Sequence, residues 1–430
     1  MSKRSCAGIL GALALVATAA VAADRAAGLK ALDYGESGPA RAALADEAAE
    51  ASLWLAFAES GAAREAAARR AIELTSERTA WIGAAATALV DLAAGRNAEA
   101  VAAARQATAL DPGQARLWKL LGEALEAQGD GAGARAAYEQ AVALQPVYPA
   151  ANVALGHLLR EQNDFANAYN AFNHALDESE EPAAALVARA GASLYLGDEA
   201  GALADLAKAV EKSPPGSVRG SALLGILMVR AYQRQLPEDI DRADEAIRMW
   251  EELGRPDMVA ASCNAVGRLM LETGYPEGSD GWYERGWQAI EGSDLAAEER
   301  TIWKVRELHG LARGAAARRE LTPARQLAEE ANQLMAADRA NADHYAWIGP
   351  YLEAYLRLAE RRWDDAISEL QRSDLERPYL MMMLGEAHFR ARNREQAREW
   401  YQRAFDASNG LDTESVIVRP QAAEWLARNR

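Results

Sequence analysis

The fold is decided by Trp118-Lys119-Leu120-Leu121-Gly122-Glu123-Ala124-Leu125, which is followed by Ala134-Arg135-Ala136-Ala137-Tyr138, Ala141 and Pro146. The same pattern recurs every 34 residues. Prolines occupy positions 112, 146 and 214, and only Glu180 breaks the series. Two series of alanines follow the same spacing: Ala100, Ala134, Ala168 and Ala202, and Ala107, Ala141, Ala175 and Ala209. A fixed period of this length predicts stacked supersecondary units rather than one globular core.

Each 34-residue unit has the pattern of two helices. Apolar residues recur at three- and four-residue spacing, which gives each helix one apolar stripe. Gly95, Gly129 and Gly197 interrupt the pattern midway, as the end of a first helix requires. Small residues such as Gly122 and Ala134 fall where two helices would cross. Because one pair cannot bury its stripe alone, we expect neighbouring pairs to stack.

These residues resemble the tetratricopeptide repeat, whose motif is W-x₂-L-G-x₂-Y, A-x₃-F and then P. Leu125 is the one departure in the best copy, because the family prefers tyrosine there. Four consecutive copies in phase cover residues 81–214. The resemblance implies a right-handed superhelical solenoid. It also implies that partners bind the concave surface, which the first helix of each pair lines in this family.

Outside this block the pattern weakens but continues. We expect an all-α fold of about ten antiparallel helix hairpins and a short closing helix near Pro420–Arg428. Residues 40–75 read as an opening pair, and residues 217–291 as pairs broken at Pro237, Pro256 and Pro276. A composition shift divides an N-terminal array, 24–216, from a degenerate C-terminal array, 217–430. The segment 213–217 is either a joint between them or an ordinary turn between repeats.

Residues 1–23 have the pattern of a cleavable export signal. Lys3 and Arg4 precede an apolar stretch from Ala7 to Val21, and Ala20-Val21-Ala22 offers small residues to a signal peptidase. The apolar stretch is about 15 residues long, against the roughly 20 that a membrane span needs. We therefore expect a periplasmic or secreted protein with no integral membrane segment after cleavage.

The net charge of −16 narrows the classes of partner. Loss of Lys3 and Arg4 with the leader gives −16 − 2 = −18. Such acidity argues against nucleic acid and anionic lipid as partners. Cys263 would be the only cysteine left, so we expect no internal disulfide and a buried, unreactive thiol.

The sequence contains no recognisable reactive constellation, so we expect no enzyme, no metal and no cofactor. His157 and Glu161 could supply two metal ligands from one helix face, but the sequence offers no third. Gly129–Gly133 joins two predicted helices and so lacks the strand that a phosphate loop follows. Four arginines in a helical segment have acidic neighbours and fit a solvated face: Arg390, Arg392, Arg394 and Arg398.

The expected function is a non-catalytic scaffold or adaptor of the bacterial cell envelope that binds a partner protein or peptide. Projection of the repeats places a mixed charged set, the concave strip, on the predicted binding surface: Arg116, Lys119, Glu123, Glu126, His157, Arg160, Glu161 and Tyr195. An ordinary solvated face explains this set equally well.

The alternative function is a glycan-contacting subunit of an envelope polysaccharide or secretion assembly. It requires exposed aromatic side chains. The candidates are Trp282, Tyr283, Trp287, Trp303, Tyr345, Trp347, Tyr351 and Tyr355. The helical spacing of Trp347, Tyr351 and Tyr355 favours a core position over an exposed one.

Overall fold

The computed structural model describes residues 52–429, apart from positions 54–55, 58–59, 76–79 and 178–181. The predicted leader and residues 40–51 of the predicted opening pair lie outside this part. The chain divides into two compact units, residues 1–185 and 186–430, which are described separately below. The division near residue 216 stays a prediction.

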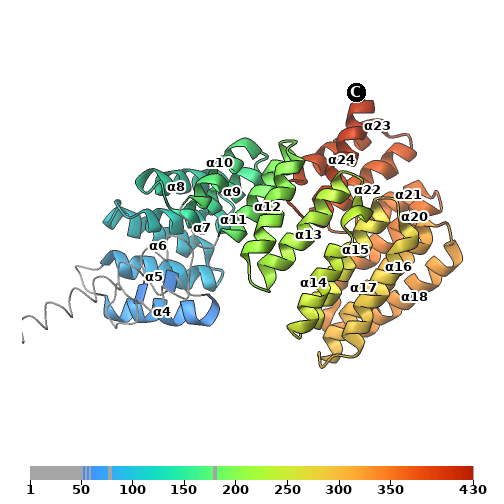
Figure 1. Cartoon of the computed structure of the whole chain (residues 1–430), viewed down its shortest axis with the longest axis horizontal. Coiled ribbons are helices and arrows are strands. Elements are labelled where there is room, and N and C mark those ends of the chain that lie inside the picture. The colour runs from blue at the N-terminus through green and yellow to red at the C-terminus, as the bar shows by residue number, and fades with distance from the viewer. Residues whose placement is uncertain (1–51, 54–55, 58–59, 76–79, 178–181, 430) are drawn as a thin grey trace, which may run out of the picture. The chain divides into compact units, whose positions relative to one another are not determined.

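Unit 1 consists of helix hairpins in chain order (Figure 1). After α4 come the pairs α5–α6, α7–α8 and α9–α10, in which each helix packs against its sequence neighbour. The bounds are α4 Gly61–Leu74, α5 Ala80–Ala93, α6 Asn97–Leu110, α7 Ala115–Gln128, α8 Gly131–Leu144, α9 Pro149–Glu161 and α10 Phe165–Leu176.

The turn between α7 and α8 shows why these hairpins are tight. Gly129 ends α7 in the left-handed conformation, with φ 87°, which a residue without Cβ adopts at little cost. Asp130 then caps α8, because its Oδ1 accepts a hydrogen bond of 2.9 Å from the backbone N–H of Gly133. Asp164 and Asp198 cap α10 and α12 in the same way. The break and the cap together reverse the chain within two residues.

Unit 2 continues the pattern with α11–α12, α13–α14, α15–α16, α17–α18, α20–α21 and α22–α23, and ends with α24. The bounds are α11 Ala183–Tyr195, α12 Glu199–Lys212, α13 Ser217–Tyr232, α14 Asp241–Glu252, α15 Pro256–Glu272, α16 Pro276–Glu291, α17 Ala297–Ala317, α18 Leu321–Ala337, α19 Ala342–Tyr345, α20 Ile348–Ala359, α21 Trp363–Leu370, α22 Pro378–Arg390, α23 Arg394–Ala407 and α24 Thr413–Arg428. Short 3₁₀ turns, η2 Leu236–Asp239 and η3 Arg339–Asn341, precede α14 and α19.

Close approach of helices depends on a glycine of one helix facing an aromatic ring of the next. The ring of Tyr138 on α8 lies against Gly122 on α7, and a Cβ at Gly156 would lie 2.5 Å from Cε1 of Phe172. In unit 2 the ring of Tyr283 lies between Gly267 on α15 and Gly310 on α17. The predicted role of Gly122 at a helix crossing is confirmed.

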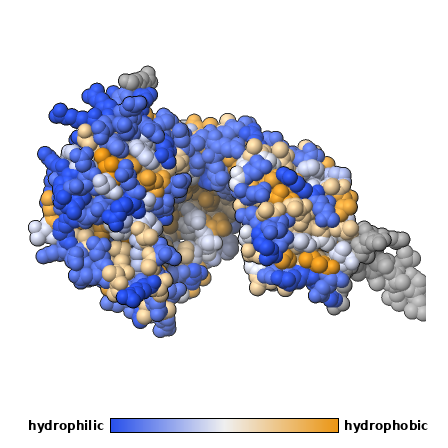
Figure 2. All heavy atoms as spheres, turned by 180° about the vertical axis from the view of Figure 1, so that it is seen from behind, coloured by the Kyte–Doolittle hydropathy of each residue, from blue (hydrophilic) through white to orange (hydrophobic). Residues whose placement is uncertain are grey.

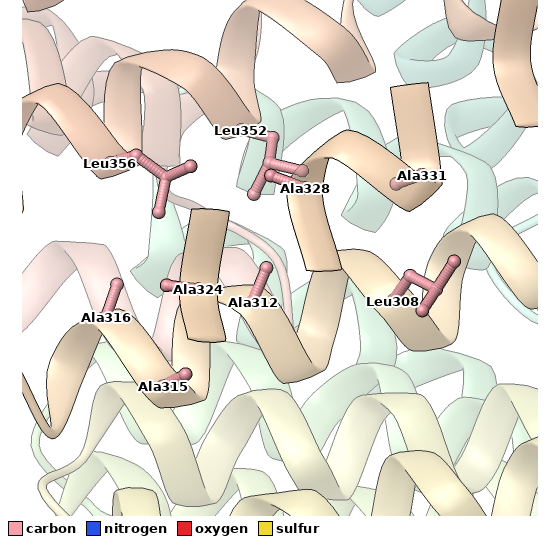
Figure 3. Packing of buried hydrophobic residues seen from close by; sticks show 9 residues of the cluster. All are labelled: Leu308, Ala312, Ala315, Ala316, Ala324, Ala328, Ala331, Leu352 and Leu356. Carbon is pink, nitrogen blue, oxygen red and sulfur yellow. The ribbon is translucent and has the colours of Figure 1, made fainter. Parts of the chain in front are cut away.

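The core passes from each hairpin into the next. One buried cluster joins α17, α18 and α20, and Figure 3 shows its alanines at the crossings with leucines filling the space between them. Its members are Leu308, Ala312, Ala315, Ala316, Ala324, Ala328, Ala331, Leu352 and Leu356. Cys263 is a free, fully buried thiol in a neighbouring cluster, and burial raises its pKa to about 12. The predicted burial of this thiol is confirmed.

The all-α solenoid of hairpins is confirmed for the described residues, which contain no strand. The predicted breaks at Pro237, Pro256 and Pro276 lie at the starts of η2, α15 and α16. The closing helix begins at Thr413, earlier than predicted, with Pro420 inside it. None of the helices in the described part combines the length and apolarity that crossing a bilayer would need.

Gly310→Ala should destabilise unit 2 by about 1–3 kcal/mol, because the new methyl group would overlap the ring of Tyr283. Gly281→Ala is the matched control, since Gly281 also lies in a helix but has no atom within 4 Å of its Cβ position. That change should be neutral or stabilising by up to about 1 kcal/mol. Urea unfolding followed by circular dichroism measures both. Equal midpoints for the two variants would contradict the packing described.

Candidate functional site

Unit 2 contains a groove that encloses about 1260 Å³. Its mouth is formed where the first helices of successive pairs end, namely α13, α15, α17 and α20. Helix α22 lines it along its length, and one face of α24 forms the facing wall. The groove therefore follows directly from the repeat, because equivalent turns come to lie along one edge.

The wall of the groove is aromatic and apolar. It carries Met382 and Met383 on α22 together with seven rings: Tyr232, Tyr355, Trp363, Tyr379, Phe389, Tyr401 and Trp425. Trp425 of α24 stacks on Tyr401 of α23, with ring centroids 4.3 Å apart and planes at 12°. This contact fixes α24 as part of the wall.

The charged residues of the groove are five arginines and three glutamates. Every glutamate already has a cationic partner. Glu424 accepts a hydrogen bond of 2.7 Å from Arg234 and forms an ion pair with Arg428 at 2.5 Å. Glu386 accepts a hydrogen bond of 2.6 Å from Arg390.

The third glutamate, Glu272, is paired with Arg313, which lies behind the wall. The remaining arginines, Arg319 and Arg361, are exposed. No carboxylate in the described part of the chain pairs with either of them. The groove thus presents an excess of positive charge in an acidic protein.

The arginines at the mouth adopt an unusual backbone conformation. Arg234, Arg319 and Arg361 have φ of 61°, 67° and 62°, the left-handed region that side chains with a Cβ rarely enter. Gly274 occupies the same turn position after α15, with φ 100°. Arg392 after α22 has φ 66° but does not line the groove.

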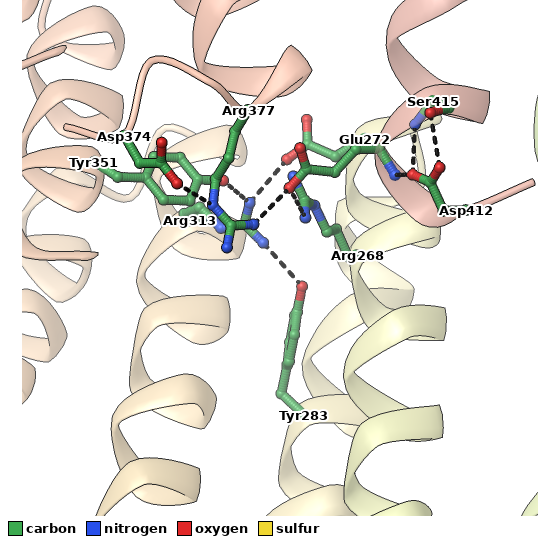
Figure 4. Close-up of polar contacts among 10 residues, drawn as sticks. Arg268, Glu272, Tyr283, Arg313, Tyr351, Asp374, Arg377, Asp412 and Ser415 are labelled. Carbon is green, nitrogen blue, oxygen red and sulfur yellow. Dashed lines mark hydrogen bonds and ion pairs between the residues drawn. The ribbon is translucent and has the colours of Figure 1, made fainter. Parts of the chain in front are cut away.

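Behind the wall lies a buried network centred on Arg313, which is 3% exposed (Figure 4). Its guanidinium donates to Glu272 at 3.2 Å, to the hydroxyl of Tyr283 at 3.2 Å and to the hydroxyl of Tyr351. Burial raises the pKa of Tyr351 to about 12, although Arg313 and Arg268 act against the rise. The network ties α15, α16, α17 and α20 together beneath the groove.

Glu414 at the start of α24 is the second anchor. It accepts hydrogen bonds from Arg268 of α15 at 3.0 Å and from Arg377 at 3.3 Å. Burial alone would raise the pKa of Glu414, but the two guanidinium groups outweigh it and hold that pKa below its usual value. The pair links residues 146 positions apart in the sequence.

The segment before α24 is tied to α11 as well. The hydroxyl of Tyr195 donates to the carbonyl oxygen of Gly410 at 2.6 Å, and the guanidinium of Arg419 lies 5.0 Å from the Tyr195 ring centroid. Tyr195, predicted as part of the concave strip, therefore holds the C-terminal segment in place.

The remaining strip residues lie in unit 1, on α7 and α9. Arg116 is 9% exposed, and Lys119 forms an ion pair with Glu123 of the same helix. Glu126 accepts a hydrogen bond of 2.7 Å from the hydroxyl of Tyr138. These side chains are engaged within the unit.

His157, Arg160 and Glu161 come together at the end of α9. Burial, with help from Arg160, lowers the pKa of His157 to about 4, and its ring packs edge-on against Phe172 at 5.2 Å. Burial, with repulsion from Glu126, raises the pKa of Glu161. Within the described ranges no three His, Cys, Asp or Glu side chains gather as metal ligands would.

The aromatic cluster proposed for glycan contact contains no exposed member. Tyr283, Tyr345 and Tyr351 are buried, and the other five are half-buried. Several are covered by cations: Arg377 lies 4.0 Å from the Trp347 ring centroid, and Lys304 lies 4.9 Å from that of Trp287. The structure favours the core interpretation of this cluster.

The arginines predicted to form a basic face between residues 390 and 398 make different contacts. Arg390 lines the groove, whereas Arg398 donates to the backbone carbonyl of Asn429 at 3.0 Å. Sequence reasoning missed the groove arginines Arg234, Arg319 and Arg361. Their signal was present as arginine in the turn position where the earlier repeats carry glycine.

A family profile and several solved structures both relate this chain to tetratricopeptide repeats. The sequence profile described as tetratricopeptide repeat matches residues 85–149, 153–217 and 351–411. The chain contains tetratricopeptide repeats. The matched tetratricopeptide repeats include α22 and α23 of the groove, while residues between 218 and 350 match no copy of the profile. No curated protein sequence matches the chain.

Several solved structures are similar in fold. A tetratricopeptide repeat protein from Parabacteroides merdae is 16% identical, with 76% of this chain and 98% of that chain covered and a TM-score of 0.42. PilF from Pseudomonas aeruginosa is 18% identical, with 51% and 96% covered and a TM-score of 0.40. MamA is 17% identical, with 38% and 95% covered and a TM-score of 0.35. At these values the likenesses carry no functional assignment.

One face of the described part of the chain offers little continuous apolar area. On the face seen in Figure 2, hydrophilic residues predominate and hydrophobic ones form small, separate patches. Large apolar patches often mark interaction sites.

Glu414→Gln should lower the stability of unit 2 by about 3 kcal/mol at neutral pH, because Arg268 would lose its buried counter-charge. The folded pKa of Glu414 is depressed, so its contribution is present above the unfolded pKa and is lost as the pH falls through the folded value. The variant should therefore lose less stability than the wild type on acidification.

Denaturant unfolding at a series of pH values from about 6 down to 3 measures this. Glu376→Gln is the control, since Glu376 is exposed. If the Glu414 variant and the wild type lose stability in parallel, the anchor assigned to Glu414 is wrong.

Proposed function

We propose that the protein is a non-catalytic scaffold of the bacterial cell envelope, and that it binds a partner protein or peptide in the groove of unit 2. Tetratricopeptide repeats generally bind proteins or peptides, and three stretches of this chain match the repeat profile. The observation that carries the proposal is the groove itself, which combines about 1260 Å³ of space, seven lining rings and exposed arginines.

The groove is a better candidate than the concave strip. In the strip, Lys119 pairs with Glu123, Glu126 is bound by Tyr138, and Arg116 is almost buried. Binding there would have to break contacts that the unit already makes. In the groove, Arg319 and Arg361 are exposed and the apolar wall faces open space.

The chemistry of the lining supports a binding role rather than a catalytic one. The groove is lined by no His, Cys, Ser, Asp or Lys, and its only aliphatic hydroxyl is that of Thr273. Its three glutamates are all held in ion pairs by arginines. A nucleophile with an adjacent base, as group transfer or hydrolysis needs, does not occur in this lining.

The envelope location rests on the leader-like residues 1–23, which combine a basic start, a short apolar stretch and small residues at the expected cleavage position. The strong negative charge of the remaining chain suits a soluble protein and disfavours nucleic acid as a partner.

Filling the groove should abolish partner capture. Ala317, the last residue of α17, lines the groove, so Ala317→Trp would occupy it without changing any charge. Ala337, the exposed last residue of α18, lies outside the groove and provides the control Ala337→Trp. Affinity capture from envelope extract with wild type and both variants measures the loss. Capture of the same proteins by Ala317→Trp and wild type would place the binding surface elsewhere.

Export should depend on the first 23 residues. Expression of the full chain in a bacterial host, followed by fractionation and N-terminal sequencing, should give a periplasmic or secreted protein that starts near Asp24. A chain that keeps Met1 and stays in the cytoplasm would contradict the envelope assignment while leaving the groove unaffected.

A further inference from the structure

We propose that the groove of unit 2 recognises an extended peptide segment in which carboxylates are interspersed with large apolar side chains. This inference rests on the proposed function and specifies its partner. The arginines at the mouth would bind the carboxylates, and the aromatic wall would take the apolar side chains.

Charge complementarity is the first support. The lining carries five arginines and three glutamates, which gives 5 − 3 = +2, whereas the whole chain carries −16. Because Glu272 is also neutralised from behind by Arg313, the surplus that a ligand meets is larger still. Guanidinium groups at a water-excluding wall bind carboxylates through strong charge-assisted hydrogen bonds.

The placement of the arginines is the second support. Arg319 and Arg361 follow the successive first helices α17 and α20, and Arg234 follows α13. The repeat therefore spaces them along one edge above the apolar wall. An extended chain can follow such an edge, with carboxylates reaching the arginines and the side chains between them entering the groove.

The backbone conformation shows that arginine at these turns has a cost. A residue with a Cβ is less favourable than glycine in the left-handed region, because its Cβ crowds the backbone. Glycine occupies the matching turns at Gly129, Gly197 and Gly274. Favourable interaction with the carboxyl end of a helix offsets part of this cost. Arg392 occupies the same position after α22 but lies outside the groove. Comparing it with Arg319 and Arg361 therefore distinguishes stabilisation of the helix end from ligand binding as the reason for arginine at these turns.

A polyanion fits the groove less well than such a peptide. Glu386 and Glu424 already hold three of the five arginines, so only Arg319 and Arg361 are left for a chain with a charge on every unit. The Trp425 ring is already stacked on Tyr401, so this pair offers no free row of ring faces to sugars. A segment with spaced carboxylates and apolar anchors matches both features.

The test uses the purified full chain and fluorescent synthetic peptides of ten residues. One alternates Glu with Leu and Phe, the second replaces Glu with Lys, and the third replaces Leu and Phe with Ser. Oligogalacturonate serves as a polyanionic sugar competitor. Anisotropy should show binding of the Glu–Leu–Phe peptide alone, weakened by added salt because its ion pairs are exposed, and no competition by the sugar.

Variants connect the binding to the arginines. Arg319→Glu combined with Arg361→Glu should weaken binding of the acidic peptide at least about tenfold, because two attractions become repulsions. The double variant should bind the Lys–Leu–Phe peptide more tightly than the wild type does. The control Arg392→Glu changes an exposed arginine of the same backbone conformation and should leave binding within about twofold of wild type. Circular dichroism melts check that all variants fold.

Several results would overturn the inference. They are no binding of the acidic peptide, equal binding of the basic one, competition by the sugar, or equal losses in the double variant and in Arg392→Glu. If the acidic peptide fails to bind while Ala317→Trp still abolishes capture of envelope proteins, the groove remains the binding surface and only the acidic chemistry of its partner is wrong.

Discussion

The packing of an aromatic ring against a glycine on the next helix is the contact on which the array depends. Gly122 with Tyr138, Gly156 with Phe172 and Gly267 with Tyr283 bring two backbones close enough for short alanine-rich helices to bury their stripes. Without that approach the alanines at the crossings would face gaps, which a densely packed interior does not tolerate. The spacing of the hairpins then fixes where each turn lies, and so where the groove opens.

The groove and the buried network are two sides of the same packing. Glu272 lines the groove on one side and holds Arg313 on the other, and Tyr379 lines it while lying beside Arg268. The polar groups behind the wall join α15, α16, α17 and α20 through hydrogen bonds and an ion pair, which braces the wall. At the mouth Arg234 still pairs with Glu424, whereas Arg319 and Arg361 are exposed and have no carboxylate partner among the described residues. A wall braced from behind, with unpaired charge at its edge, is suited to binding a ligand at little reorganisation cost.

The sequence predicted the hairpins well because they depend on local signals. Gly129, Asp130 and the prolines that start α15 and α16 act within a few residues. The groove was not predicted, since α24 reaches it through contacts such as Arg268–Glu414 that no local pattern encodes. Tyr195 was assigned to a partner for the same reason: its hydrogen bond to Gly410 spans 215 positions. The sequence shows that Arg319 and Arg361 occupy turn positions where other repeats have glycine. It does not show that they line the same groove as α24.

Helix α24 packs not only on its neighbour α23 but also on α13, α15 and α22, and this changes what kind of array unit 2 is. In an open solenoid each repeat touches only the next, so repeats can be gained or lost at modest cost. Here the last helix must meet helices that precede it by well over a hundred residues. Insertion or deletion of a single hairpin between α15 and α22 would move those meeting points apart. Unit 2 should therefore tolerate substitution within its repeats better than the gain or loss of a whole hairpin.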